Sequence, residues 1–141
     1  MAKKSGILDL SGFDTILKKI EDAGGSIDKS VDACMNKAGE ILYKEQKSAM
    51  KVKKVADSLI NRMEKPVLTK DFNFSKIVVG YEKGVYNPQK LTDGYKAIFI
   101  NYGTPKISPR KFVELAKKKA KPQVNKAAQE TFNEILKGLK S

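Results

Sequence analysis

The chain has 141 residues, of which 40% are hydrophobic and 31% charged, so it is long enough for one folded domain, too short for a multidomain enzyme and too apolar for wholesale disorder. Lysine and arginine outnumber aspartate and glutamate by 28 to 16 and histidine is absent, which gives a formal net charge of +12 and permits an anionic partner without requiring one. No apolar run approaches the roughly 18–20 residues of a membrane span, and the N-terminus lacks the apolar stretch of a secretion signal, so we expect synthesis in the cytoplasm and no membrane partner.

The first 50 residues predict two helices. Residues 1–12 are a polar, glycine-containing lead-in that we expect to be flexible. Phe13, Leu17 and Ile20 fall on one helical face, which predicts a short first helix ended by Gly24-Gly25. Ser26 is a candidate N-cap for a second helix of about six turns, whose apolar positions are Ile27, Val31, Cys34 or Met35, Ala38, Ile41, Leu42 and Ala49.

The middle of the chain predicts a third helix and then strands. Val55, Leu59 and Met63 have helical spacing within residues 51–65, and Pro66 would close that helix. Short segments rich in β-branched and aromatic residues then predict strands at 67–69, 72–74, 76–81 and 95–101, with turns at Gly84, Asn87-Pro88 and Asp93-Gly94. We interpret the aromatic residues of this region as core packing rather than a nucleobase platform: Phe72, Phe74, Tyr81, Tyr86, Tyr95, Phe99 and Tyr102.

The last third of the chain is helical in pattern. Ser108 is a candidate N-cap, and Pro109 would occupy the first helical position of a helix that includes Phe112. Pro122 either kinks this helix or opens another, and an apolar stripe continues to Leu139. The order helices, strands, helices predicts a single α+β domain over residues 1–141, with C-terminal helices packed on one face of a small antiparallel sheet.

Enzymatic chemistry finds little support in the residues. The chain has no phosphate-binding glycine loop, no nucleophile elbow and one cysteine, Cys34, whose place in an apolar pattern is typical of a small buried hydrophobe. Paired carboxylates occur on lysine-rich helical faces, where they are typical of surface ion pairs or lack further metal ligands: Glu40 and Glu45, Glu130 and Glu134, Asp28 and Asp32. We expect no catalytic, cofactor-binding or metal-binding residues.

A basic cluster is the clearest candidate for an interaction site. Residues 106–126 carry eight basic side chains and one acidic side chain, Glu114, and the basic ones are Lys106, Arg110, Lys111, Lys117, Lys118, Lys119, Lys121 and Lys126. This cluster is either the solvated surface of a helix or a surface that contacts phosphates without reading sequence. The chain has 26 lysines and two arginines, which argues against sequence-specific base recognition.

The segment from Phe99 to Phe112 resembles the tail-component and head-to-tail connector family of long-tailed bacteriophages, also called neck or tail-completion proteins. In that family a strand is followed by Gly-Thr, a proline-bearing loop and a phenylalanine that opens a C-terminal helix. The matching residues are Tyr102, Gly103, Thr104, Pro109 and Phe112. The similarity extends over about residues 13–137, although Asn101 stands where the family often has an acidic residue. Independently of the family, Gly103 suits a positive φ, Thr104 suits local hydrogen bonds, and Phe112 suits an anchor for the last helix on the sheet.

The resemblance implies a non-enzymatic structural protein of a phage or prophage, acting at the head-to-tail joint or tail end in tail completion and head–tail joining. It implies self-assembly into a ring, expected to be a hexamer, contact with neighbouring connector and tail proteins, and a location in the virion tail or neck after synthesis in the host bacterial cytoplasm. The basic cluster would face packaged DNA or an acidic neighbouring ring. The alternative that the charge alone suggests is a non-specific nucleic-acid-binding protein.

Overall fold

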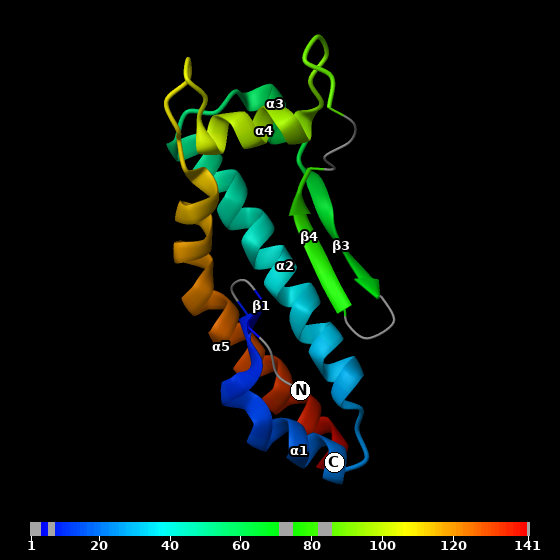
Figure 1. The fold of residues 1–141 in the computed structure, drawn as a ribbon. Helices are drawn as coiled ribbons and strands as arrows, with labels where there is room; N and C mark the ends of the chain where they lie inside the picture. Colours follow the sequence, from blue (N-terminus) through cyan, green and yellow to red (C-terminus); the bar gives the residue numbers. More distant parts are fainter. Residues whose placement is uncertain (1–3, 6–7, 71–74, 82–85, 141) are drawn as a thin grey trace.

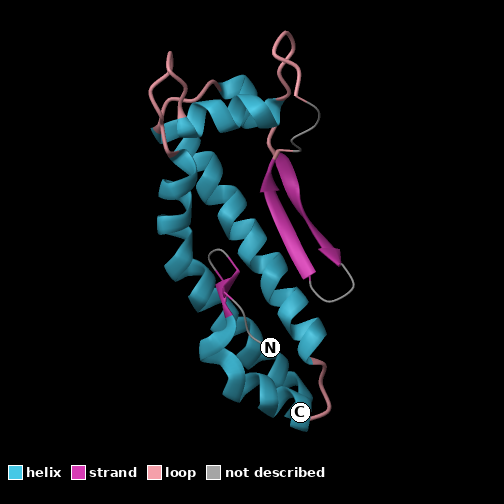
Figure 2. Ribbon diagram, viewed as in Figure 1, coloured by secondary structure: helices cyan, strands magenta, loops and turns pink. Residues whose placement is uncertain are grey.

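Two long helices form the body of the molecule in a computed structural model, which describes all residues except 1–3, 6–7, 71–74, 82–85 and 141. Helices α2 (Ile27–Val52) and α5 (Phe112–Lys140) lie side by side and run in opposite directions (Figure 1). The other elements are β1 (Lys4–Ser5), β2 (Leu8–Asp9), the 3-10 helix η1 (Leu10–Phe13), α1 (Asp14–Asp22), α3 (Asp57–Asn61), β3 (Glu64–Lys70), β4 (Ser75–Gly80) and α4 (Asp93–Tyr102). The separate helices and hairpin strands of Figure 2 confirm the predicted α+β class.

The first two helices begin and end close to where the sequence predicts. Ser26 is the N-cap of α2, and its side chain accepts a hydrogen bond from the Lys29 amide at 3.2 Å. Between the helices, Gly24 adopts a φ of 93°, a conformation that suits glycine. In the part of the lead-in that the structure describes, β1 pairs with β2 and η1 leads into α1. The chain therefore passes from β2 through η1 into α1 without a further loop.

Small side chains bring α2 and α5 together. The buried residues of α5 recur at every fourth position, a spacing typical of helices that pack through their i, i+4 ridges: Phe112, Ala116, Ala120, Val124, Ala128 and Phe132. They meet buried residues of α2 that include Cys34, Ala38 and Ala49. One stripe of α5 therefore runs through both core clusters of the described chain.

The β3–β4 hairpin lies on the opposite side of α2 from α5 (Figure 1). Val67 pairs with Val78 on the outer face, and Leu68 pairs with Ile77 toward α2. The helix that covers this sheet is α2, so the prediction that the C-terminal helices pack on the sheet is wrong. A close approach at Gly39 makes this contact possible: a Cβ there would overlap the end of Ile77 and lie 3.2 Å from the Pro66 Cβ.

Residues 95–101 are helical, and the predicted strand there is wrong. They belong to α4, whose N-cap Thr92 accepts a hydrogen bond from the Tyr95 amide at 3.4 Å. Asp93 and Gly94 open this helix instead of forming a turn. A short apolar run such as residues 97–100 cannot be assigned to helix or strand by periodicity alone, because it is apolar on every side. The Thr92 cap and the acidic first turn are the signals for a helix.

Two further helix boundaries differ from the prediction. Residues 51–52 are the end of α2, only Asp57–Asn61 of residues 53–65 is helical, and Pro66 lies inside β3 beside a register irregularity instead of closing a helix. Val55, Leu59 and Met63 are nevertheless buried together, as their apolar character predicts. At the other end, α5 begins at Phe112, so Ser108 is no N-cap and Pro109 lies outside the helix. Pro122 lies within α5 and does not open another helix.

Candidate functional site

The loop between α4 and α5 is a fixed corner. Gly103 has a φ of 80°, and a Cβ at this position would lie 2.8 Å from both the Ile107 oxygen and the Pro109 nitrogen. Thr104 and Ile107 exchange backbone hydrogen bonds of 2.8 and 3.1 Å. The Thr104 hydroxyl also accepts hydrogen bonds from the Lys106 and Ile107 amides, at 3.1 and 3.0 Å. Backbone geometry therefore demands glycine at position 103. Gly103 follows helix α4 and not the strand that the sequence predicts.

Asn101 caps α5 from a neighbouring element, a role that sequence reasoning missed. Its side chain is buried and accepts a hydrogen bond from the Val113 amide at 3.0 Å, and its backbone oxygen accepts one from Lys111 at 3.0 Å. Val113 is the second residue of α5, so its amide has no partner inside the helix. Phe112 packs beside this cap in the cluster shared by α2, α3, α4 and α5, and Val79 of β4 packs against the same cluster.

The corner is tied to the end of α2. The Arg110 guanidinium donates a hydrogen bond to the Lys54 backbone oxygen at 2.7 Å. This contact joins two lysine-rich segments, residues 51–54 and 106–121, which the sequence separates widely. Together these segments carry ten basic side chains against one acidic, a net charge of +9 within the chain's total of +12. We name these two segments, together with the uncharged start of the corner at residues 102–105, the basic end.

The basic end differs from the predicted basic cluster, because the fold leaves out one of the predicted residues and adds three lysines from another segment. All eight of its basic side chains are exposed, and seven of them belong to the basic end. Lys126 lies farther along α5, beyond Gln123, which bonds Glu45 of α2 at 3.1 Å. Three lysines that the prediction missed join the seven, and the composition of this run was itself the signal: Lys51, Lys53 and Lys54.

Two lysines of the basic end have unusual backbone conformations. Lys54 and Lys111 have φ values of 59° and 48°, and within the described part of the chain they are the non-glycine residues with positive φ. At Lys54 the end of α2 is closed by hydrogen bonds from the Val55 amide to Met50 and from the Lys54 amide to Lys51, at 2.9 and 3.0 Å. This is the Schellman arrangement, whose positive-φ position is usually glycine. A lysine thus occupies a site where glycine is locally more favourable.

Contacts between short elements hold α3 and α4 across the same end. Arg62 makes two hydrogen bonds to the Asp93 carboxylate, at 2.9 and 3.1 Å, and these bonds lower the pKa of Asp93. The Tyr81 hydroxyl donates to the Leu59 backbone oxygen, and burial raises the pKa of Tyr81 to about 12. The remaining ion pair that the structure gives for the described residues joins Lys70 and Asp32 at 2.5 Å, away from the basic end. The lysines of the basic end therefore face solvent without a carboxylate partner among the described residues.

Exposed apolar side chains also gather at this end. Tyr102 is 69% exposed, Val52 57% and Ile107 43%. Outside the basic end, Tyr86 precedes α4, has its ring centroid 5.1 Å from that of Tyr95 and is 51% exposed. The prediction that the aromatic residues pack in the core is wrong for Tyr102 and Tyr86, whereas Tyr81, Tyr95 and Phe99 are partly buried; Phe72 and Phe74 lie outside the described residues.

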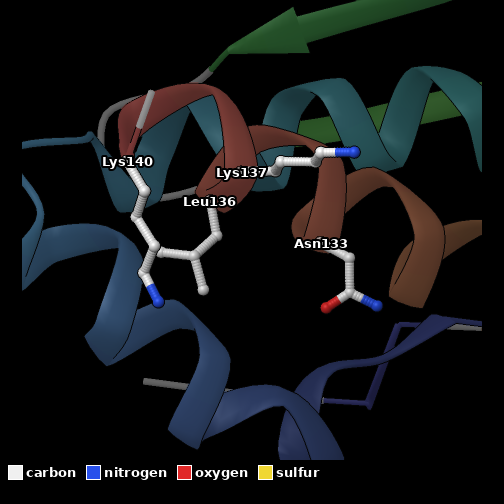
Figure 3. Close-up of a pocket in the computed structure, with 4 residues that line it drawn as sticks. All are labelled: Asn133, Leu136, Lys137 and Lys140. Atoms are coloured by element: carbon white, nitrogen blue, oxygen red, sulfur yellow. The ribbon is translucent and has the colours of Figure 1, made fainter.

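Elsewhere the described residues offer little chemistry. Cys34 is buried in the core between α2 and α5, and burial raises the pKa of its thiol to about 11. No three His, Cys, Asp or Glu side chains gather as metal ligands in the ranges that the structure describes. An open hollow near the end of α5 is lined by Asn133, Leu136, Lys137 and Lys140 (Figure 3), which offer no paired acid and nucleophile. No helix in these ranges has both the length and the apolar character to cross a membrane.

Comparison with known proteins gives one family. The model of the HK97-gp10-like family, described as "Bacteriophage HK97-gp10, putative tail-component", matches residues 14–103. This range runs from α1 to the glycine of the corner and leaves all eight basic side chains of the predicted cluster at residues 106–126 outside it. No curated protein and no solved structure shows significant similarity to the chain. Because the match spans well over half of its length, the chain belongs to the HK97-gp10-like family of phage tail components.

Proposed function

We propose that this phage tail component acts at the head-to-tail joint or tail end, where it completes the tail and allows head and tail to join. The observation that carries the proposal is the basic end, which holds most of the net charge of the chain at the end of the molecule where α2 ends and α5 begins. A joint protein needs such a localised, preformed surface, because it must meet one particular neighbour at one end of an assembly. The protein acts by association, without catalysis or a cofactor.

The proposal includes self-assembly. Copies form a ring around the tail axis, expected to be a hexamer, through heterologous side-by-side contacts. Within the ring, the corner built by Tyr102, Gly103, Thr104, Pro109 and Phe112 is a structural motif that fixes the basic loop. The basic residues, including the predicted Lys126, are candidates for contact with packaged DNA or with a neighbouring connector or tail protein. The protein resides in the virion tail or neck after synthesis in the host cytoplasm.

A charge-reversal variant tests the proposal. Lys117, Lys118 and Lys119 are exposed on α5 and carry no ion pair with a described residue. Their joint replacement by glutamate should impair particle joining when the variant complements a phage that lacks the gene. Joining at the wild-type level would contradict a role for this surface, provided that the variant has the thermal stability of the wild-type protein.

The basic end also favours a second candidate, non-specific binding of nucleic acid. Ten basic side chains would release counterions from phosphates, so the affinity would fall steeply with salt. A gel shift with duplex DNA over a salt series measures this directly. Binding weaker than about micromolar at physiological salt would contradict a free nucleic-acid-binding role.

A further inference from the structure

The basic end presents apolar surface together with positive charge. Tyr102 is the most exposed of the large hydrophobic side chains in the described chain, and Ile107 lies on the same corner through the Thr104–Ile107 hydrogen bonds. Val52 lies two residues before Lys54, whose oxygen bonds Arg110 of the corner. Single exposed apolar residues are ordinary. These three lie on segments that a hydrogen bond ties together, and Val52 and Ile107 adjoin lysines in the sequence, so this end of the molecule presents a mixed apolar and basic surface.

This mixed surface distinguishes between the two kinds of anionic partner. Duplex DNA offers phosphates and sugars along its outside, and its apolar base faces are stacked inside, so it would leave Tyr102 and Ile107 uncovered. A protein interface instead buries an apolar centre in which tyrosine is enriched, and charges at its rim steer the approach.

The backbone supports a preformed surface. Thr104 accepts amide hydrogen bonds within the corner, and the Arg110 guanidinium fastens the corner to α2. Lys54 keeps a positive φ where glycine would relieve strain. Strained backbone that persists is often associated with function. A charged side chain held there is consistent with a contact that needs the lysine.

We propose that the basic end docks an acidic protein surface with exposed apolar side chains, contributed by a neighbouring virion protein, and that it does not dock the packaged DNA. This inference rests on the proposed function at the head-to-tail joint. Tyr102 and Ile107 form the apolar centre of the contact, and the lysines of residues 51–54 and 106–121 steer the acidic partner onto it. The unpaired lysines gain carboxylate partners only in the assembled particle.

A matched pair of uncharged variants tests the inference by complementation of a phage that lacks the gene. Tyr102→Ser should lower the yield of joined particles about tenfold or more, because a tyrosine at the centre of an interface is typically an energetic hot spot. Tyr86→Ser removes an equally large exposed side chain outside the basic end and should leave the yield unchanged. Neither variant changes the charge, so affinity for a short DNA duplex at about 150 mM salt should be equal in both.

Photocrosslinking identifies the partner class. A benzoylphenylalanine placed at Tyr102 in assembled virions should crosslink to a peptide rich in aspartate and glutamate from another virion protein. Crosslinking to DNA, or to a segment without acidic residues, overturns the inference. Wild-type joining by Tyr102→Ser while deletion of the gene abolishes joining also overturns it and leaves the proposed function intact. Normal joining after deletion would instead remove the proposed function.

Discussion

The contact between α2 and the hairpin depends on the absence of a side chain at Gly39, and Gly39→Ala tests it. In an exposed helix this substitution stabilises by about 1 kcal/mol, because alanine has the higher helix propensity. Here the new Cβ would overlap the Ile77 Cδ1 and lie 3.1 Å from its Cγ1 and 3.2 Å from the Pro66 Cβ. Overpacking of this kind costs about 1–3 kcal/mol. We therefore expect a net loss of about 1 kcal/mol in the free energy of unfolding.

A second substitution isolates the steric cost. Ile77→Val removes the overlapping Cδ1, and alone it should cost about 0.5–1.5 kcal/mol. The double variant should be more stable than the sum of the two single effects predicts, by about 1 kcal/mol, since the residues share one contact. Gly138→Ala in α5 is the matched control, because no atom lies within 4 Å of its new Cβ and the substitution should stabilise.

Urea denaturation followed by circular dichroism measures the free energy of unfolding of the four variants and the wild type. In a thermal melt, 1 kcal/mol corresponds to about 3 °C in Tm for a chain of this size. Stabilisation by Gly39→Ala similar to that by Gly138→Ala would refute the close packing of α2 on the hairpin. Additive effects of Gly39→Ala and Ile77→Val would refute the assignment of the cost to the Ile77 side chain.

Four further substitutions probe the site end of the molecule. Asn101→Ala should cost about 1–2 kcal/mol in urea denaturation by uncapping α5, and a cost below about 0.5 kcal/mol would contradict the cap. Gly103→Ala should destabilise by more than about 1 kcal/mol in the same assay, since both the positive φ and the crowded Cβ oppose it; a neutral effect would contradict the corner. Lys54→Gly should stabilise by about 0.5–1 kcal/mol while lowering the yield of joined particles, and a variant that destabilises would contradict the strained Schellman position. Tyr81 loses its proton near pH 10 when unfolded and near pH 12 when folded, so stability should fall as pH rises between these values; the loss should disappear in Tyr81→Phe, and a tyrosinate absorbance titration without one late-ionising group would contradict the burial.

The sequence predicted an element correctly where capping residues and hydrophobic spacing within that element mark its type and its ends. Ser26 and the apolar stripe after it predict α2, and the β-branched residues around Leu68 and Ile77 predict the hairpin strands. Residue type and spacing gave a wrong prediction where neighbouring residues decide the secondary structure. Residues 97–100 are apolar on every side, so only the Thr92 cap and the acidic first turn indicate a helix. Pro66 belongs to a strand because β3 tolerates an irregularity beside it.

The candidate site was predicted in part because seven of its ten basic side chains lie in one contiguous segment, residues 106–121. The lysine cluster after Lys106 is visible in the sequence, whereas its union with Lys51, Lys53 and Lys54 depends on the Arg110 contact across the fold. The Asn101 cap could not be predicted once its segment was interpreted as a strand, because the interaction joins one helix end to the start of another. The exposure of Tyr102 was not predicted for the same reason. An aromatic residue beside a strand was expected to pack in the core, whereas Tyr102 lies in the last turn of α4 with its side chain exposed.

This chain belongs to a phage tail-component family, and we propose that it completes the tail and enables head–tail joining. Electron microscopy of an induced lysate from a strain that lacks the gene tests the claim most directly. The account predicts filled heads beside separate tails, or tails of uncontrolled length if the role lies in ending the tail. Intact virions in normal number would contradict the account and make nucleic-acid binding the leading explanation of the basic end.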